Sequence, residues 1–241
     1  MRTSPVLSST LVLTAHGSVD PRSAAVTHAV AGRIRRLRPW LAVRAAFLEK
    51  CAPSLHDVLS ETGDATVVPF LLADAYHARV DIPAVIDAVG ASVRTAPVLG
   101  EDPALLSVAH LRLTEAGVSP YDDDLGVIVV AVGSSDATAN ARTSTIAPAL
   151  ADGTRWAGIK VAFATGPHAD LVGTAAALRE SGARRLVVVP WFLAHGRITD
   201  RVTDFAARED IATAEPLGSH NLVAATVLDR FDDVTENRVA A

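Results

Sequence analysis

The sequence predicts an α/β protein made of two tandem subdomains, each a small parallel sheet flanked by helices. Short apolar runs rich in β-branched residues alternate along the chain with segments of helical period, a pattern typical of βαβ units. A stretch with a proline, three consecutive aspartates and a glycine, residues 120–126, interrupts this alternation near the middle of the chain. The same strings then return in the same order, which indicates an internal duplication.

Eight strands follow from the apolar runs, and helices are expected between them. The expected strands are 11–14, 43–47, 65–70, 93–96, 125–132, 159–164, 185–190 and 211–214. Asp20 as N-cap and Pro21 at the first helical position predict the start of the first helix, because the missing N–H of proline costs nothing there. Ser54, with Asp57 three residues later, predicts the start of the second helix.

The duplication is visible in the strings themselves. Val-Ala-Val-Gly-Ser-Ser-Asp (130–136) resembles Leu-Thr-Ala-His-Gly-Ser (13–18), and Val-Val-Pro-Trp-Phe-Leu-Ala (188–194) resembles Val-Val-Pro-Phe-Leu-Leu-Ala (67–73). We therefore expect an N-terminal subdomain of residues 1–121 and a C-terminal subdomain of residues 122–241, and we call the two copies the first and second repeats.

Composition limits the class of protein. A chain of 241 residues, 49% of them hydrophobic, can bury a substantial core. The longest apolar run, 186–194, is far shorter than the roughly 18 residues of a membrane span, and no signal peptide is apparent, so we expect a cytoplasmic protein that binds no membrane. The net charge of −5 lies entirely in the second half and gives no support for nucleic-acid binding. The single cysteine, Cys51, excludes an intramolecular disulfide, and we expect it to be a small, partly buried side chain rather than a soft metal ligand near Glu49.

Three side chains of the first repeat have metal-binding chemistry and follow predicted strands: His16, Glu49 and His77. Because open α/β sheets bind ligands at the carboxyl ends of their strands, we expect them to converge there. Two imidazoles and a carboxylate suit ferrous, cobaltous, nickel or zinc ions, and three protein ligands leave a coordination position open. His16 and His77 are also candidate bases, since histidine titrates near neutrality. Glu49 is either a direct ligand or an orienter of a histidine.

The second repeat lacks all three candidate ligands. The shared strings align His16 with Val132, Glu49 with Thr165 and His77 with Ile198. Their joint loss, while apolar strands and turn glycines persist, predicts one active and one structural half.

Four strings, in this order, resemble those of the class II chelatases of the CbiX/SirB type, which insert ferrous or cobaltous ion into sirohydrochlorin. The strings are Leu-Val-Leu-Thr-Ala-His-Gly-Ser (11–18), Ala-Ala-Phe-Leu-Glu (45–49), Val-Val-Pro-Phe-Leu-Leu-Ala-Asp-Ala-Tyr-His (67–77) and Asp-Ile-Pro (81–83). The resemblance covers nearly the whole chain in two passes. It implies a chelatase without an organic cofactor, in which a bent tetrapyrrole loses two pyrrole protons and draws the metal from its protein ligands.

Sirohydrochlorin carries many carboxylates, so the resemblance also implies arginines and helix N-termini around it. Ser18, Arg22 and Arg79 are placed to bind the substrate. Asp74 departs from the family pattern, where many relatives carry glycine; it is a further ligand, an orienter or a loop carboxylate facing water. His195 is a candidate to reach the site from the second repeat.

The choice of metal and the alternatives stay open at this point. We expect ferrous ion, for sirohaem; cobalt insertion on the route to cobalamin is the alternative, and a non-catalytic metal carrier is a third possibility. The histidine phosphatases also place His-Gly after the first strand, but they need an arginine where this chain has Ala15. A monomer is expected, because the duplication supplies both halves.

Overall fold

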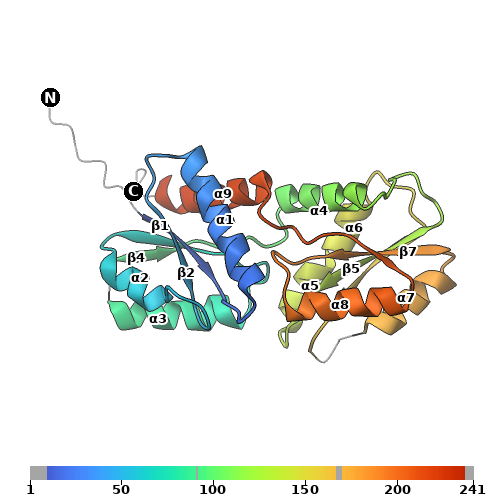
Figure 1. Cartoon of the computed structure of the whole chain (residues 1–241), viewed down its shortest axis with the longest axis horizontal. Coiled ribbons are helices and arrows are strands. Elements are labelled where there is room, and N and C mark those ends of the chain that lie inside the picture. Colours follow the sequence, from blue (N-terminus) through green and yellow to red (C-terminus); the bar gives the residue numbers. More distant parts are fainter. Residues whose placement is uncertain (1–9, 91, 167–169, 237–241) are drawn as a thin grey trace. The chain divides into compact units, whose positions relative to one another are not determined.

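The computed structural model describes residues 10–90, 92–166 and 170–236 (Figure 1). They contain two four-stranded sheets, and every strand pairs in parallel with its neighbours. Helices flank both sheets, so the predicted fold class is confirmed.

The first sheet has the strand order β2–β1–β3–β4. Its strands are β1 (Thr10–Ala15), β2 (Val43–Phe47), β3 (Ala65–Pro69) and β4 (Val93–Thr95). One face packs against α2 (Leu55–Glu61) and α3 (Ile82–Val89) through an apolar cluster that includes Val12 and Val67. Helix α1 (Pro21–Leu37) contacts β1 and β2, and its His28 ring lies 5.5 Å from that of Phe47, the neighbour of the cluster residue Ala46.

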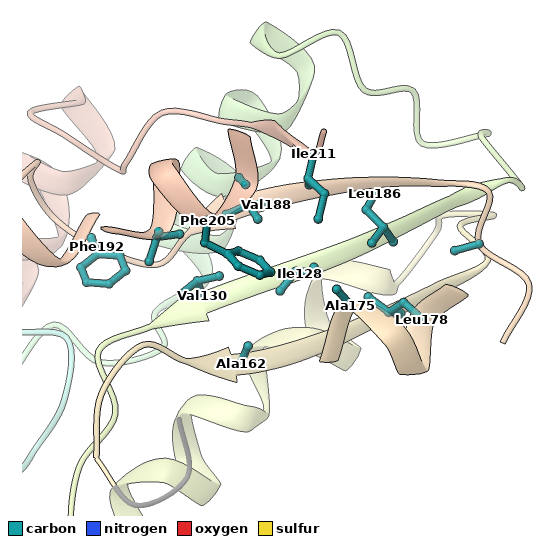
Figure 2. Close-up of a cluster of buried hydrophobic side chains, with 13 residues drawn as sticks. Ile128, Val130, Ala162, Ala175, Leu178, Leu186, Val188, Phe192, Phe205 and Ile211 are labelled. Atoms are coloured by element: carbon teal, nitrogen blue, oxygen red, sulfur yellow. The ribbon is translucent and has the colours of Figure 1, made fainter. Parts of the chain in front are cut away.

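The second sheet repeats this topology in the order β6–β5–β7–β8. Its strands are β5 (Leu125–Ala131), β6 (Gly158–Phe163), β7 (Arg185–Pro190) and β8 (Ala212–Thr213). Helices α7 (Leu171–Glu180) and α8 (Arg197–Arg208) supply the cluster on one face, where Figure 2 shows Phe205 of α8 beside Ile128 and Val130 of β5. Two further helices, α5 (Ala137–Ser144) and α6 (Ile146–Ala151), contact β6.

The pairing register is the same in both sheets. Leu11 of β1 pairs with Val43 and Thr66. The residue aligned with it, Val127 of β5, pairs with Ile159 and Val187, which are the residues that the shared strings align with Val43 and Thr66. The duplication therefore extends from the sequence to the individual hydrogen-bonded pairs.

The predicted strands all occur, with ends that shift by a few residues; the shortest is β8, which keeps only two of the expected four residues. The predicted helix starts are confirmed as well. The Asp20 carboxylate accepts a hydrogen bond from the Arg22 N–H at 3.0 Å, and the Ser54 hydroxyl accepts one from the Asp57 N–H at 3.1 Å. Both are N-caps of the expected kind.

The compact units differ from the predicted division at residue 121. One unit comprises the described residues up to Gly100 together with those from Ala224 onward, and the other comprises Glu101–Val223. The cause is the packing of the last helix of each repeat, α4 (Pro103–Glu115) and α9 (Asn221–Glu236). Helix α4 of the first repeat belongs to the unit that contains the second sheet. Helix α9 of the second repeat belongs, from Ala224 onward, to the unit that contains the first sheet.

Hydrogen bonds fix this exchange of helices. Arg112 of α4 donates to the carbonyls of Pro216 and Leu217, at 3.0 and 3.1 Å, and α4 also contacts α6 and β7. Arg230 of α9 donates to the carbonyls of Val98 and Leu99, at 3.1 and 3.0 Å. Asp232 of α9 also forms an ion pair with Arg38.

Among the described residues, no helix is both long enough and apolar enough to cross a membrane.

Candidate metal centre

His16 and Glu49 lie on two adjacent turns that leave the carboxyl ends of β1 and β2. The Glu49 N–H donates to the His16 carbonyl at 3.0 Å, which extends the pairing of the two strands by one step. Gly17 makes this approach possible. Its φ is +91°, and a Cβ at this position would lie 1.8 Å from the Glu49 carbonyl oxygen. Only glycine fits both constraints, so the His-Gly pair positions Glu49 as well as His16.

His77 begins a π-helical turn, His77–Asp81, that leads directly into α3. The Ile82 N–H donates to the His77 carbonyl, as the wider π turn requires, and Pro83 has no N–H to offer to the preceding turn. Single π turns occur frequently at functional sites. The Asp-Ile-Pro string thus shapes the backbone that carries His77.

The structure brings the three predicted side chains together. The rings of His16 and His77 meet edge to face, with centroids 4.0 Å apart and planes inclined by 74°. Glu49 Oε1 lies 3.2 Å from His16 Nδ1. All three side chains are 34–47% exposed, so a solute can reach them without unfolding of the surrounding chain.

Asp81 orients His77 and was missed by the sequence reasoning. Its Oδ2 lies 2.6 Å from His77 Nδ1, and because an ionised carboxylate can only accept, this contact favours a proton on Nδ1. His16 Nδ1 likewise faces an oxygen, the Gly17 carbonyl at 3.1 Å. The spacing of four residues between His77 and Asp81 is the signal that identifies such a pair on a helix.

Lys50 makes the strongest contact to Glu49. Its Nζ lies 2.7 Å from Glu49 Oε1. This ammonium lowers the pKa of the Glu49 carboxyl below its ordinary value, and the positive charges that His16 and His77 carry when protonated act in the same direction. Glu49 is therefore an anion at neutral pH.

In this arrangement of side chains, no group of three or more His, Cys, Asp or Glu residues in the described ranges is placed to bind one metal ion jointly. Glu49 faces Lys50 and the Nδ1 atom of His16, and His77 Nδ1 faces Asp81. A metal held by all three predicted ligands therefore needs rotation of side chains, above all that of Glu49 away from the ammonium.

The three predicted substrate contacts already have partners. Arg22 Nη2 lies 2.6 Å from Asp20 Oδ2, and Arg79 Nη2 lies 2.9 Å from Asp74 Oδ2, which gives Asp74 a role as the partner of an arginine. The Ser18 hydroxyl accepts from the Asp20 N–H at 3.0 Å.

The Ser18 turn also occurs in the second repeat. There the Ser134 hydroxyl accepts from the Asp136 N–H at 3.0 Å, and Asp136 caps α5 as Asp20 caps α1. The turn thus belongs to the fold shared by both repeats. Two other candidates have partners of their own: Cys51 is half-buried and donates from Sγ to the Ser18 carbonyl at 2.9 Å, and His195 Nε2 lies 2.7 Å from Glu215 Oε2.

The second repeat keeps the same turn geometry without the candidate ligands. The Thr165 N–H donates to the Val132 carbonyl at 2.8 Å, and Gly133 has the same φ of +91° as Gly17. A Cβ on Gly133 would lie 2.5 Å from the Thr165 carbonyl oxygen, so this turn also needs its glycine. His16 and Glu49 are therefore additions to a turn geometry that both repeats share.

The fold is a duplicated parallel α/β fold with a histidine pair and a carboxylate at one sheet edge. The model of the CbiX family matches residues 10–116 and, a second time, residues 126–234. The chain belongs to the CbiX family, and the two matches agree with the two predicted repeats.

A curated relative is the sirohydrochlorin cobaltochelatase of Priestia megaterium, which is 29% identical over 177 residues. The match covers 67% of this chain and 57% of that protein, so the chain spans little more than half of its length.

Solved structures of SirB share the fold. SirB from Bacillus subtilis with Fe³⁺ has a TM-score of 0.80 at 20% identity, with 97% of this chain and 98% of that chain covered. The sirohydrochlorin chelatase SirB from Bacillus subtilis subspecies spizizenii, in complex with cobalt, has a TM-score of 0.70 at 19% identity, with 96% and 97% covered. At these identities the likeness concerns the fold.

Proposed function

We propose that the chain is a sirohydrochlorin chelatase that inserts ferrous ion into sirohydrochlorin to form sirohaem. The observation that carries this proposal is the meeting of His16, Glu49 and His77 at the carboxyl edge of the first sheet. Family membership and the curated relative support the macrocycle as substrate. Cobalt insertion is the alternative, favoured by the name of that relative.

In the proposed reaction the metal is a substrate, not a resident cofactor, and no organic cofactor takes part. His16, Glu49 and His77 bind the divalent ion first, since imidazole and carboxylate bind such ions readily and the surrounding chain leaves them accessible. The macrocycle then gives up its two pyrrole protons and takes the metal by its four nitrogens. His16 and His77, once free of the metal, are the bases that receive those protons.

Arg22 and Arg79 are proposed to bind the carboxylates of the macrocycle. Each guanidinium has five N–H donors, so it can contact a substrate carboxylate in addition to its aspartate or in exchange for it. Ser18 is proposed as a weaker contact, because its hydroxyl already accepts a hydrogen bond from the Asp20 N–H. The protein is further proposed to act as a monomer in the cytoplasm, which size-exclusion chromatography with light scattering and cell fractionation would test.

The experiment that tests the function is an anaerobic spectrophotometric insertion assay with sirohydrochlorin, run with ferrous and with cobaltous ion. His16→Ala and His77→Ala are expected to lower the insertion rate at least about a hundredfold, or roughly 2.7 kcal/mol of barrier, because each removes a ligand and a base. Thr165→Ala, at the position aligned with Glu49, is the control that should keep the rate.

A dicarboxylate porphyrin serves as the second substrate. It should react slower by orders of magnitude, since it lacks most of the charged groups that the arginines recognise. Equal rates on the two macrocycles, or histidine variants within about threefold of wild type, would contradict the proposal. Metal binding without insertion into either macrocycle would favour a metal carrier.

A further inference from the structure

Lys50 occupies a backbone position where glycine is the residue to expect. Its φ is +61°, in the left-handed region that residues with side chains seldom adopt. The Cys51 N–H donates to the Glu49 carbonyl at 2.8 Å and closes a three-residue turn around Lys50. Turns of this kind with a positive φ at the central residue are strained.

The second repeat has the residue that relieves this strain. The shared strings align Lys50 with Gly166, whose φ is +82°. The fold therefore needs a left-handed residue here in both repeats, and glycine satisfies that need without strain. The repeat that lacks the histidines and the glutamate has the glycine, whereas the repeat that carries them has a lysine. A strained residue at such a place points to a function of its side chain.

The side chain of Lys50 reaches the carboxylate among the three candidate ligands. Its Nζ lies 2.7 Å from Glu49 Oε1, the same oxygen that lies 3.2 Å from His16 Nδ1. Both side chains are about half exposed, at 48% for Lys50 and 47% for Glu49, so the ammonium can leave the carboxylate without disturbing the fold. A divalent cation bound to this oxygen would repel the ammonium, because like charges a few ångströms apart repel each other.

We propose that Lys50 is a positioning residue that competes with the divalent metal for the Glu49 carboxylate. The competition weakens the hold of the protein on the metal and speeds its release to the macrocycle. As the metal leaves, the ammonium returns to Glu49 and compensates its charge. This inference rests on the proposed function, in which Glu49 binds the metal together with His16 and His77.

The test uses cobaltous ion alone and the full chain, so it does not depend on turnover. Affinity is measured by calorimetric titration, and the release rate by stopped-flow mixing of the cobalt-loaded protein with excess EDTA. Lys50→Gln removes the charge and keeps the length of the side chain, whereas Lys50→Arg keeps the charge. The matched control is Lys160→Gln, because Lys160 is the other lysine of the chain and lies exposed on β6.

Lys50→Gln is expected to bind cobaltous ion about three- to tenfold more tightly than wild type and to release it more slowly by a similar factor. Lys50→Arg and Lys160→Gln should stay within about twofold of wild type. Lys50→Gly, which fits the turn without strain, should show the same tighter binding together with a higher melting temperature. That variant separates the loss of charge from any disturbance of the backbone.

Two negative results are distinguishable. If the wild-type protein binds cobaltous ion, His16→Ala abolishes the binding, and Lys50→Gln and Lys50→Gly bind no more tightly than wild type, the inference about Lys50 is overturned while the proposed function stands. If the wild-type protein does not bind the ion at all, both are overturned.

Discussion

At His77 a single carboxylate decides which ring nitrogen is presented to a ligand. The 2.6 Å contact between Asp81 Oδ2 and His77 Nδ1 favours a proton on Nδ1, which is the tautomer in which Nε2 is the candidate ligand atom. Because the pair is joined by one helical turn, Asp81 also fixes the direction of the ring. Loss of the carboxylate charge should therefore weaken both effects.

We expect Asp81→Asn to lower the affinity for cobaltous ion about tenfold, in line with other carboxylate partners of metal-binding histidines. Calorimetric titration measures this directly. Asp87→Asn is the control, since Asp87 is exposed on α3, the helix that follows the π turn of Asp81. An Asp81→Asn variant that binds the metal like the control would show that Asp81 serves the fold only.

The meeting of His16, Glu49 and His77 could be predicted because it depends on topology alone. Each residue follows a strand, and parallel strands end at one edge. The partners Asp81 and Lys50 could not be predicted in the same way. They depend on the π turn after Tyr76 and on the left-handed turn after Glu49, and neither turn follows from hydrophobic periodicity.

Strands and helix starts were the elements easiest to predict. Helices cover both faces of each sheet, so both sides of each strand are apolar. Each strand therefore appears in the sequence as a continuous apolar run. A side-chain cap such as Asp20 bonds to a backbone N–H only two or three residues away. The start of the helix can therefore be predicted from the local sequence. The π turn could not be predicted, because it is a local widening of five residues, His77–Asp81, and leaves no hydrophobic period in the sequence.

Helix α4 carries a histidine whose neutral form the fold favours. His110 is half-buried, with its ring centroid 6.1 Å from that of Trp156. Burial lowers the pKa of His110 below its ordinary value of about 6.5. The unfolded chain then binds a proton near pH 6.5 while the folded chain does not, so stability is highest above this pH and falls as the pH drops through it.

We expect His110→Gln to reduce the loss of unfolding free energy between pH 7.5 and pH 5.5. Urea denaturation of wild type and variant at both pH values checks this. His56→Gln, which removes a histidine that is 59% exposed on α2, should leave the pH dependence unchanged. Equal pH dependence in wild type and His110→Gln would show that His110 is not responsible.

For the molecule as a whole, the compact units do not coincide with the repeats. The family matches of 10–116 and 126–234 meet near the predicted break at residues 120–126. The exchange of α4 and α9 could not be predicted, because hydrophobic periodicity marks the apolar face of a helix but not the sheet against which that face packs. Only specific contacts, such as that of Arg230 with the carbonyls of Val98 and Leu99, decide between the two arrangements.

A matched pair of variants tests the exchange. Arg230→Ala, in the second repeat, is expected to speed amide hydrogen exchange in β1 and β3 of the first sheet. Arg112→Ala, in the first repeat, should do so in β5 and β7 of the second sheet. Each removes two hydrogen bonds from a charged donor, a loss of about 1–3 kcal/mol. Faster exchange in the sheet of the same repeat would contradict the exchange of helices.

The exchange of helices bears on how such a chain can arise. A gene for one repeat would encode a chain whose last helix has its proper sheet only on another copy, so the ancestor would be a dimer with swapped helices. Fusion of two such genes places both sheets on one polypeptide. The packing of each last helix on its sheet is then intramolecular and no longer depends on protein concentration. It also ends the requirement that both copies be identical. The two copies can then diverge, so that one carries the histidines and Lys50 and the other carries neither histidine and has Gly166 at the aligned position.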